Sequence, residues 1–282
     1  MITATLTDPT GVQVVGSWDH DGQHSGGDLL TSLVGWIAGV GVESERVSRS
    51  SGHGDFPAPT RRTSRTLTMS VLCERDSRAE LWALEREFSG LFAEGGTGTL
   101  TVDQDGSVLT AQVDLDGEPK PLTNLDAGFV SVEVPLHASD PVLYAPERVT
   151  TLHPVGVGIG LRYPLFADGV LDFGAGVTGD EVIQNFGNTT AYPIVWVYGD
   201  FPGGWQLTAG DRSIVWPWPT VLTAPVRVDM SGSIWIGPDN VTHLASVRRW
   251  VSIPKNGSLS LTLAPIQGGS GWGEVHQRDT YL

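Results

Sequence analysis

The stretch FVSVEVPLHASDPVLY, residues 129–144, decides the fold of this chain. Its apolar side chains recur at every second position, at Val130, Val132, Val134 and Leu136. A period of two is typical of a strand that buries one face. The run breaks at Pro141, because proline fixes φ and cannot donate a hydrogen bond to a sheet. The sequence therefore predicts a long strand that closes a first domain.

Working outward, the length of 282 residues favours two domains in a mainly β chain. We expect a β domain with one helix at residues 1–145, an extended linker rich in proline and glycine at 146–162, and a β-sandwich at 163–267. The sandwich is predicted from short strand-like runs that turns separate, without a helical pattern. The remaining residues, 268–282, form a C-terminal tail. This tail is either a peptide that docks on a neighbouring molecule through Trp272 and Tyr281 or a frayed end.

One helix is predicted over residues 76–92, directly after a strand at residues 65–73. Asp76 and Ser77 supply N-cap chemistry, and two glycines at residues 95 and 96 suit the stop. Apolar residues at helical spacing form one stripe, which we interpret as core packing: Leu81, Leu84, Phe88, Leu91 and Phe92. Further on, the pair Asp105-Gly106 predicts a hairpin between strands at residues 99–102 and 108–115.

The charge of the chain limits its partners. A formal net charge of −15 argues against a surface that grips a phosphate backbone and suits a surface past which DNA slides. Only Lys120 and Lys255 are lysines among the 17 basic residues, which indicates a GC-rich genome, because arginine codons are GC-rich. No apolar run approaches the length of a transmembrane helix, about 18 residues or more. The start of the chain also lacks the basic and apolar regions of a signal peptide.

Five arginines form a basic island in this acidic chain: Arg46, Arg49, Arg61, Arg62 and Arg65. A surface that binds nucleic acid would interleave aromatic residues for base stacking, and only Phe56 is present. Two interpretations stay open. The island is either a protruding hairpin or loop that pairs with acidic groups of a neighbouring subunit, or a solvated loop. The first interpretation makes these arginines candidate subunit-interface residues.

No pattern in the sequence predicts catalysis or a cofactor. The chain lacks a nucleophile elbow, a zinc-protease helix and a phosphate-binding glycine loop, so we expect that it is not an enzyme. Asp19, His20, Asp21 and His24 invite a metal interpretation, but their spacing is not that of a calcium loop, and a solvated loop is favoured. The single cysteine, Cys73, lies on the apolar face of its strand and is predicted to be a small buried hydrophobe.

Seven of the ten tryptophans lie between residues 196 and 272. A β-sandwich with exposed tryptophans is a common carbohydrate platform, which makes four residues candidates for sugar contact: Trp205, Trp216, Trp218 and Trp235. The competing interpretation is that these rings fill the sandwich core or a subunit interface, where large aromatic residues dominate burial. Trp218 is expected to be exposed, because the prolines beside it cannot sit in a central strand.

The order of several stretches resembles the siphophage distal tail proteins, the Dit family. The first is the arginine-led strand that runs into a helix over residues 65–92, and the second is the A-x-D-P-x-x-Y ending of the strand at residues 129–144. The third is the run NFGN at residues 185–188 that leads into residues 192–199, and a strand ending in Asp229 follows. None of these motifs is catalytic. The resemblance lies in their order and spacing along nearly the whole chain.

The resemblance implies a tail-tube-like split barrel followed by a galectin-like sandwich, and structural work in the virion. Six copies would form a ring at the distal end of the tail, assembled in the host cytoplasm. The ring would join the major tail tube protein to the tail hub or tail-associated protein. The tape measure protein would end in its lumen, and DNA would pass through transiently. A phage of a GC-rich actinobacterial host is expected. The alternative function is binding of a host-surface glycan by the sandwich.

Overall fold

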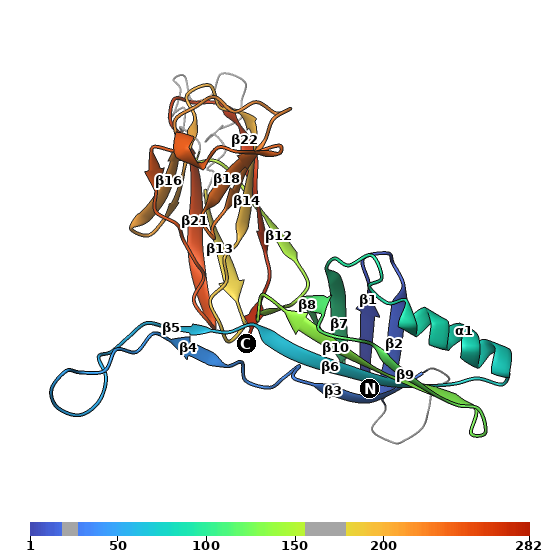
Figure 1. Cartoon of the computed structure of the whole chain (residues 1–282). Helices are drawn as coiled ribbons and strands as arrows, with labels where there is room; N and C mark the ends of the chain where they lie inside the picture. Colours follow the sequence, from blue (N-terminus) through green and yellow to red (C-terminus); the bar gives the residue numbers. More distant parts are fainter. Residues whose placement is uncertain (19–27, 156–178) are drawn as a thin grey trace. The chain divides into compact units, whose positions relative to one another are not determined.

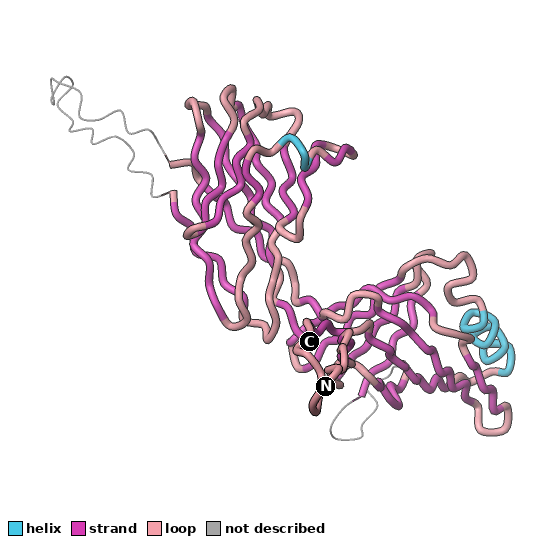
Figure 2. Tube along the Cα trace, turned by 60° about the vertical axis from the view of Figure 1, so that its left-hand side comes forward, coloured by secondary structure: helices cyan, strands magenta, loops and turns pink. Residues whose placement is uncertain are grey.

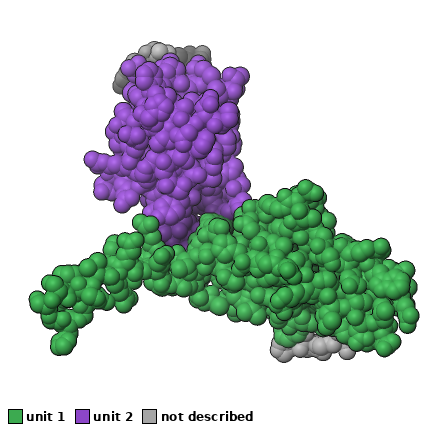
Figure 3. All heavy atoms as spheres, viewed as in Figure 1, with its two compact units in different colours: residues 1–146, 282 green, residues 147–281 purple. Residues whose placement is uncertain are grey.

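The computed structural model describes residues 1–18, 28–155 and 179–282. The chain divides into two compact units, residues 1–146 with Leu282 and residues 147–281 (Figure 3). Strands make up most of both units, as the magenta segments in Figure 2 show. The predicted mainly β fold is therefore confirmed.

The first unit contains one helix and a large sheet (Figure 1). Its elements are β1 (Ile2–Thr7), β2 (Gln13–Trp18), β3 (Leu29–Val34), β4 (Val42–Ser44), β5 (Thr60–Arg62), β6 (Arg65–Glu74), α1 (Arg78–Ser89), β7 (Gly98–Gln104), β8 (Ser107–Leu115), β9 (Lys120–Asn124), β10 (Phe129–Ala138) and β11 (Leu143–Tyr144). The strand order is β11-β8-β7-β1-β2-β3-β6-β10-β9, and β8 also pairs with β10. This extra pairing brings two distant strands of the sheet together, as in a partly closed barrel.

Strand β10 is the predicted central strand, and it pairs over its whole length with β6. Its alternate residues from Val130 to Ala138 are fully buried, opposite the buried residues of β6 such as Met69 and Val71. The period of two seen in both sequences places these side chains on one face of the sheet. The pair thus forms the centre of the first core.

Helix α1 begins with a capping box, in which the Ser77 hydroxyl accepts from the Glu80 backbone and the Glu80 carboxylate accepts from the Ser77 backbone. The helix ends at Ser89, earlier than predicted, and Gly90 is its C-cap. The chain then turns, and Phe92 adopts a left-handed φ of 56°. Leu81, Phe88, Leu91 and Phe92 are buried, so the predicted apolar stripe packs in the core even where the helix has ended.

Asp8, in the turn after β1, connects that turn to the chain segment after the helix. Its Oδ1 accepts hydrogen bonds from Thr10 N, Thr10 Oγ1 and Val12 N at 2.8–2.9 Å, and its Oδ2 accepts one from Phe92 N at 3.3 Å. Burial raises the pKa of this carboxyl, but the hydrogen bonds together outweigh burial and hold the pKa below its ordinary value of 3.8. The ionised form of Asp8 therefore stabilises the first unit.

We expect Asp8 to make the first unit sensitive to acid. A lowered folded pKa contributes stability that is complete above the unfolded value of 3.8 and is lost as the pH falls through the folded pKa. In Asp8→Asn that contribution no longer titrates, so the loss of stability between about pH 6 and pH 3 should become smaller. Urea unfolding at both pH values measures this, with Asp126→Asn in an exposed turn as the control. An unchanged pH dependence in Asp8→Asn contradicts the assignment.

The second unit is a sandwich of two antiparallel sheets, with one short 3-10 helix in its described part. Its elements are β12 (Arg148–Leu152), β13 (Asp180–Asn185), β14 (Ile194–Asp200), β15 (Trp205–Ala209), β16 (Arg212–Trp216), β17 (Val226–Asp229), β18 (Ser233–Ile236), β19 (Asp239–Asn240), η1 (Thr242–Leu244), β20 (Val247–Arg248), β21 (Gly257–Pro265), β22 (Ser270–Gln277) and β23 (Thr280–Tyr281). One sheet has the order β12-β22-β14-β17-β18-β19 and the other β13-β21-β15-β16-β20. Apolar side chains from both sheets form one buried core.

The structure corrects two of the predicted boundaries. Residues 148–152 are not part of a linker, because they form β12 and pair with β22. Residues 268–282 are not a loose tail, because β22 lies between β12 and β14 inside the six-stranded sheet. Glycines hide this strand in the sequence. The backbone of β14 lies very close to Gly271, and a Cβ added there would be 2.1 Å from the Tyr198 carbonyl oxygen. The close backbone therefore requires glycine at a strand position where an alternating apolar side chain would otherwise signal the strand. Residues 156–162 of the predicted linker lie outside the described residues.

Candidate functional site

Residues 42–62 form an arm, which consists of β4, β5 and the loop between them. The two strands pair from Val42 opposite Arg62 to Ser44 opposite Thr60, and the loop closes through a bridge between Ser48 and Asp55. In Figure 1 the arm projects to the left, away from the other strands of its own unit. Nearly all of its residues are exposed. An isolated two-stranded hairpin without a packed face is only marginally stable in water, so a partner surface would stabilise the arm.

The arm carries apolar side chains that its own unit leaves uncovered. Val42, Val47 and Phe56 are 55%, 64% and 55% exposed. Val47 and Phe56 lie opposite each other, since the Phe56 N–H donates to the Val47 carbonyl, and the Arg49 guanidinium stands 5.6 Å from the centre of the Phe56 ring. An apolar pair beside a cation on a projecting hairpin is typical of a protein contact.

Four of the five predicted interface arginines lie on this arm. Arg46, Arg49, Arg61 and Arg62 are exposed, and Arg62 also donates to the Val40 carbonyl at 2.8 Å. They are available to a partner, as the prediction requires, and their role in an interface stays a prediction.

Arg65 was wrongly predicted to be an interface residue, because only 3% of it is exposed. Its guanidinium donates to the carbonyls of Gly35, Trp36 and Ala38 through Nη1 and to that of Pro141 through Nε. It therefore joins the loop after β3 to the turn after β10. The sequence held a signal for this burial, since Arg65 has the same strand parity as the buried residues of β6.

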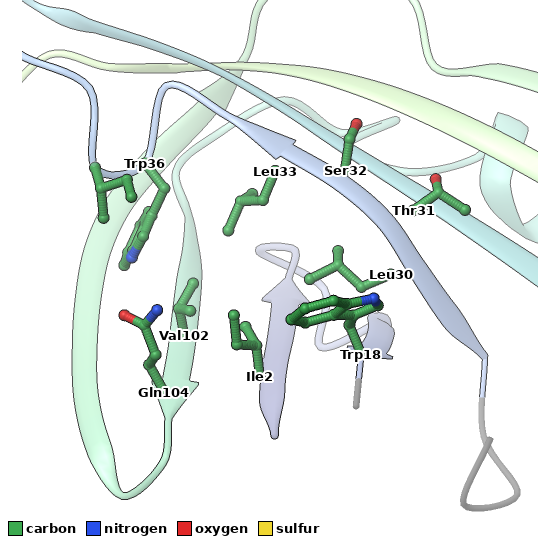
Figure 4. A pocket seen from close by; sticks show the side chains of 10 residues that line it. Ile2, Trp18, Leu30, Thr31, Ser32, Leu33, Trp36, Val102 and Gln104 are labelled. Atoms are coloured by element: carbon green, nitrogen blue, oxygen red, sulfur yellow. The ribbon is translucent and has the colours of Figure 1, made fainter. Parts of the chain in front are cut away.

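A pocket of about 300 Å³ opens in the first unit between β3 and the ends of β1 and β7 (Figure 4). Its lining includes the buried side chains of Leu30 and Trp36 and the more exposed side chains of Trp18 and Ile37, which are 46% and 82% exposed. No titratable side chain lines it. Its volume is at the low end for small-molecule sites, so it suits a single bulky apolar side chain. The pocket thus lacks groups for acid–base chemistry.

Two of the tryptophans predicted to contact sugar are core residues. Trp205 and Trp216 are 0% and 1% exposed, lie opposite each other on β15 and β16, and stack with ring centres 6.3 Å apart. The Trp205 indole donates to the Thr220 hydroxyl at 3.1 Å. These two predictions are wrong, and the competing core interpretation holds for them. Trp218 is 51% exposed on the connection after β16, and Trp235 is partly buried on β18.

Sequence reasoning missed a second set of aromatic residues, on the six-stranded sheet. Tyr198 stacks between Trp196 and Trp272, with ring centres 6.2 and 5.3 Å away. All three are partly exposed on the face that points away from the core, since their neighbours Val195 and Val197 are fully buried. Burial, and next the charge of Glu274, raise the pKa of Tyr198. The signal was available in the alternation of Trp196 and Tyr198 with buried valines.

The described residues contain little that points to catalysis or metal binding. Within them, no group of three or more His, Cys, Asp or Glu residues could hold a metal ion. Asp19, His20, Asp21 and His24 lie outside the described residues. Burial raises the pKa of the Cys73 thiol, as expected of a structural cysteine. None of the described helices is long and apolar enough to cross a membrane.

Comparison with solved structures shows that a known protein has a similar fold. No family model matches this sequence, and no curated protein matches it. The crystal structure of the Dit protein of phage SPP1, a paradigm of the hub adsorption apparatus in phages that infect Gram-positive bacteria, is similar over 100% of both chains, with 11% identity and a TM-score of 0.66. Two structures of the phage P2 baseplate in its activated conformation, with Ca and with Sr, align with 13% and 12% identity over 99% of this chain and 98% of theirs, each with a TM-score of 0.49. The chain thus has the fold of the SPP1 Dit protein.

Proposed function

We propose that this chain is a structural virion protein, a distal tail protein that forms a ring between the tail tube and the tail tip of a siphophage. The observation that carries the proposal is the likeness to the SPP1 Dit protein over the full length of both chains. A shared fold does not by itself imply a shared function, so features of this chain must support the role. The unpartnered arm and the acidic surface do so.

The arm supports assembly with further copies of the same chain. A ring of identical subunits uses one head-to-tail interface in which two different surfaces of the protein meet. The arm, with Phe56 beside Arg49, is one such surface, and the apolar pocket is suited to be the other. We propose that the Phe56 side chain enters this pocket on the next copy.

The net charge of −15 supports a channel role, because an acidic lumen would let DNA pass without binding it. In this proposal, one face of a six-membered ring contacts the major tail tube protein and the other the tail hub or tail-associated protein, while the tape measure protein ends in the lumen. The work is structural and requires no catalysis. The arginine-rich, lysine-poor composition supports a GC-rich actinobacterial host.

Light scattering followed by negative-stain images tests the ring. We expect a mass of six subunits and six-fold rings with a central hole, either alone or after addition of the tail tube protein. A chain that stays monomeric at every concentration and also with the tail tube protein contradicts the proposal.

The same measurement tests the arm. Phe56→Ser and Ile37→Ser should each raise the concentration at which rings form by about tenfold or more, because each removes an apolar anchor or part of its pocket. If the two side chains touch across the interface, the double variant should weaken assembly by less than the sum of the single effects. Trp82→Ser, which removes an exposed residue of α1, is the matched control and should leave assembly unchanged. Additive effects would exclude direct contact between Phe56 and the pocket.

A further inference from the structure

The outward face of the six-stranded sheet carries an ordered array of aromatic and polar side chains. Strand alternation turns Val195, Val197 and Val275 into the core, so that Trp196, Tyr198 and Glu274 point the other way. We propose that this face binds a neutral oligosaccharide. The assignment goes beyond assembly of the ring. Of the four tryptophans that the sequence proposed for sugar contact it keeps only Trp235, and it adds Trp196, Tyr198 and Trp272.

One row of the array crosses five adjacent strands. The registers place Glu274 of β22 opposite Trp196 of β14, Trp196 opposite Arg227 of β17, Arg227 opposite Trp235 of β18, and Trp235 opposite Asn240 of β19. A carboxylate, a ring, a guanidinium, a ring and an amide thus alternate. With about 4.8 Å between strands, the row is roughly 19 Å long. This row of side chains matches an extended ligand along which apolar surfaces and hydroxyl groups alternate.

The second row adds a continuous aromatic surface. Tyr198 lies opposite Trp272 and stacks on it with an interplanar angle of 16°, and it stacks on Trp196 at 18°. Three rings from two strands therefore stand together at one end of the first row. A sugar ring presents a C–H face that packs against an aromatic side chain, and its hydroxyls require hydrogen-bonding groups at the edge of that contact.

Neighbouring side chains hold several of these groups in place. The Trp272 indole donates to Glu274 Oε1 at 3.0 Å, and the Trp235 indole donates to Ser233 Oγ at 2.9 Å. Arg227 lies 3.4 Å from a carboxylate oxygen of Asp229 on the same strand. Such contacts restrict the side-chain rotamers before a ligand arrives, which lowers the entropic cost of binding.

The charges decide between classes of ligand. The carboxylates of Glu274 and Asp229 on this face disfavour the phosphates of nucleic acids and anionic lipids. The core of a protein–protein interface is usually depleted in charged residues, whereas here the ring of Trp196 lies between Glu274 and Arg227. Rings that alternate with both donors and acceptors match a neutral glycan.

The test uses the full chain on an array of neutral hexose, pentose and N-acetylhexosamine oligosaccharides, followed by titration calorimetry with the tightest-binding oligosaccharide. Trp196→Ala and Trp272→Ala should each weaken binding by about tenfold or more, and Trp196→Phe should restore most of the loss. Trp218 was itself a sequence-based candidate for sugar contact, but it lies outside the array, so the present assignment predicts that Trp218→Ala changes binding by less than twofold. Circular dichroism and the melting temperature establish that each variant is folded.

Three outcomes overturn the proposal. The first is the absence of binding to any neutral oligosaccharide on the array by the wild-type chain. The second is binding that survives both Trp196→Ala and Trp272→Ala, and the third is binding that Trp218→Ala abolishes. Ring formation is measured on the same samples by light scattering. Because the glycan face lies in the second unit and the arm in the first, a failure of glycan binding with intact rings leaves the distal tail role standing.

Discussion

Arg65→Ala is expected to lower the free energy of unfolding of the first unit by about 4 kcal/mol. The guanidinium donates to four carbonyl oxygens at 2.7–3.1 Å, on Gly35, Trp36, Ala38 and Pro141. A hydrogen bond to a charged group is worth about 1.5–3 kcal/mol, and the values do not add fully, because three of these bonds share one nitrogen. Removal of the guanidinium leaves these carbonyls without their donor, and the loop after β3 loses its hydrogen-bonded link to the turn after β10.

Urea unfolding followed by circular dichroism measures the effect. Arg65→Lys should be intermediate, since an ammonium is a point charge that cannot reach both groups of carbonyls at once. Arg61→Ala on the exposed arm is the control, with an expected change below about 0.5 kcal/mol. If Arg65→Ala were as stable as Arg61→Ala, the structural role of Arg65 would be wrong.

Trp205→Ala is expected to destabilise the second unit by about 3–5 kcal/mol. Its ring is completely buried, stacks on Trp216 and donates to the Thr220 hydroxyl. Truncation removes the largest class of apolar side chain from the core, leaves a cavity and deprives Thr220 of its partner. The measurement is the midpoint of the unfolding transition of the sandwich, which should shift to a lower denaturant concentration or a lower temperature.

The control for this core substitution is again Trp218→Ala. Its ring is half exposed, so we expect a cost of about 1 kcal/mol or less, from the lost bond of the indole to the Leu244 carbonyl. Trp205→Phe should fall between the two, because a smaller ring fills part of the cavity. Equal stabilities of Trp205→Ala and Trp218→Ala would contradict the burial of Trp205.

Several elements have local signals and could be predicted from the amino-acid sequence. The alternation at residues 129–144 predicted β10, the residues at the helix start predicted the cap of α1, and Asp105-Gly106 predicted the hairpin of β7 and β8. Each depends on backbone preferences or on side-chain periodicity within a few residues. The mainly β class follows from these elements together.

Which distant strands pair, and which side chains meet the opposing sheet, depends on tertiary contacts. Periodicity showed that Trp205 and Trp216 lie on regular strands, but the opposing sheet determined that they fill the core, while Trp196 points outward. Strand parity indicates that Arg65 is buried, but its carbonyl partners come from two loops far along the chain, which the sequence does not reveal. β22 was hidden because Gly271 is required by the close backbone of β14, and such a contact between distant residues leaves no local pattern in the sequence.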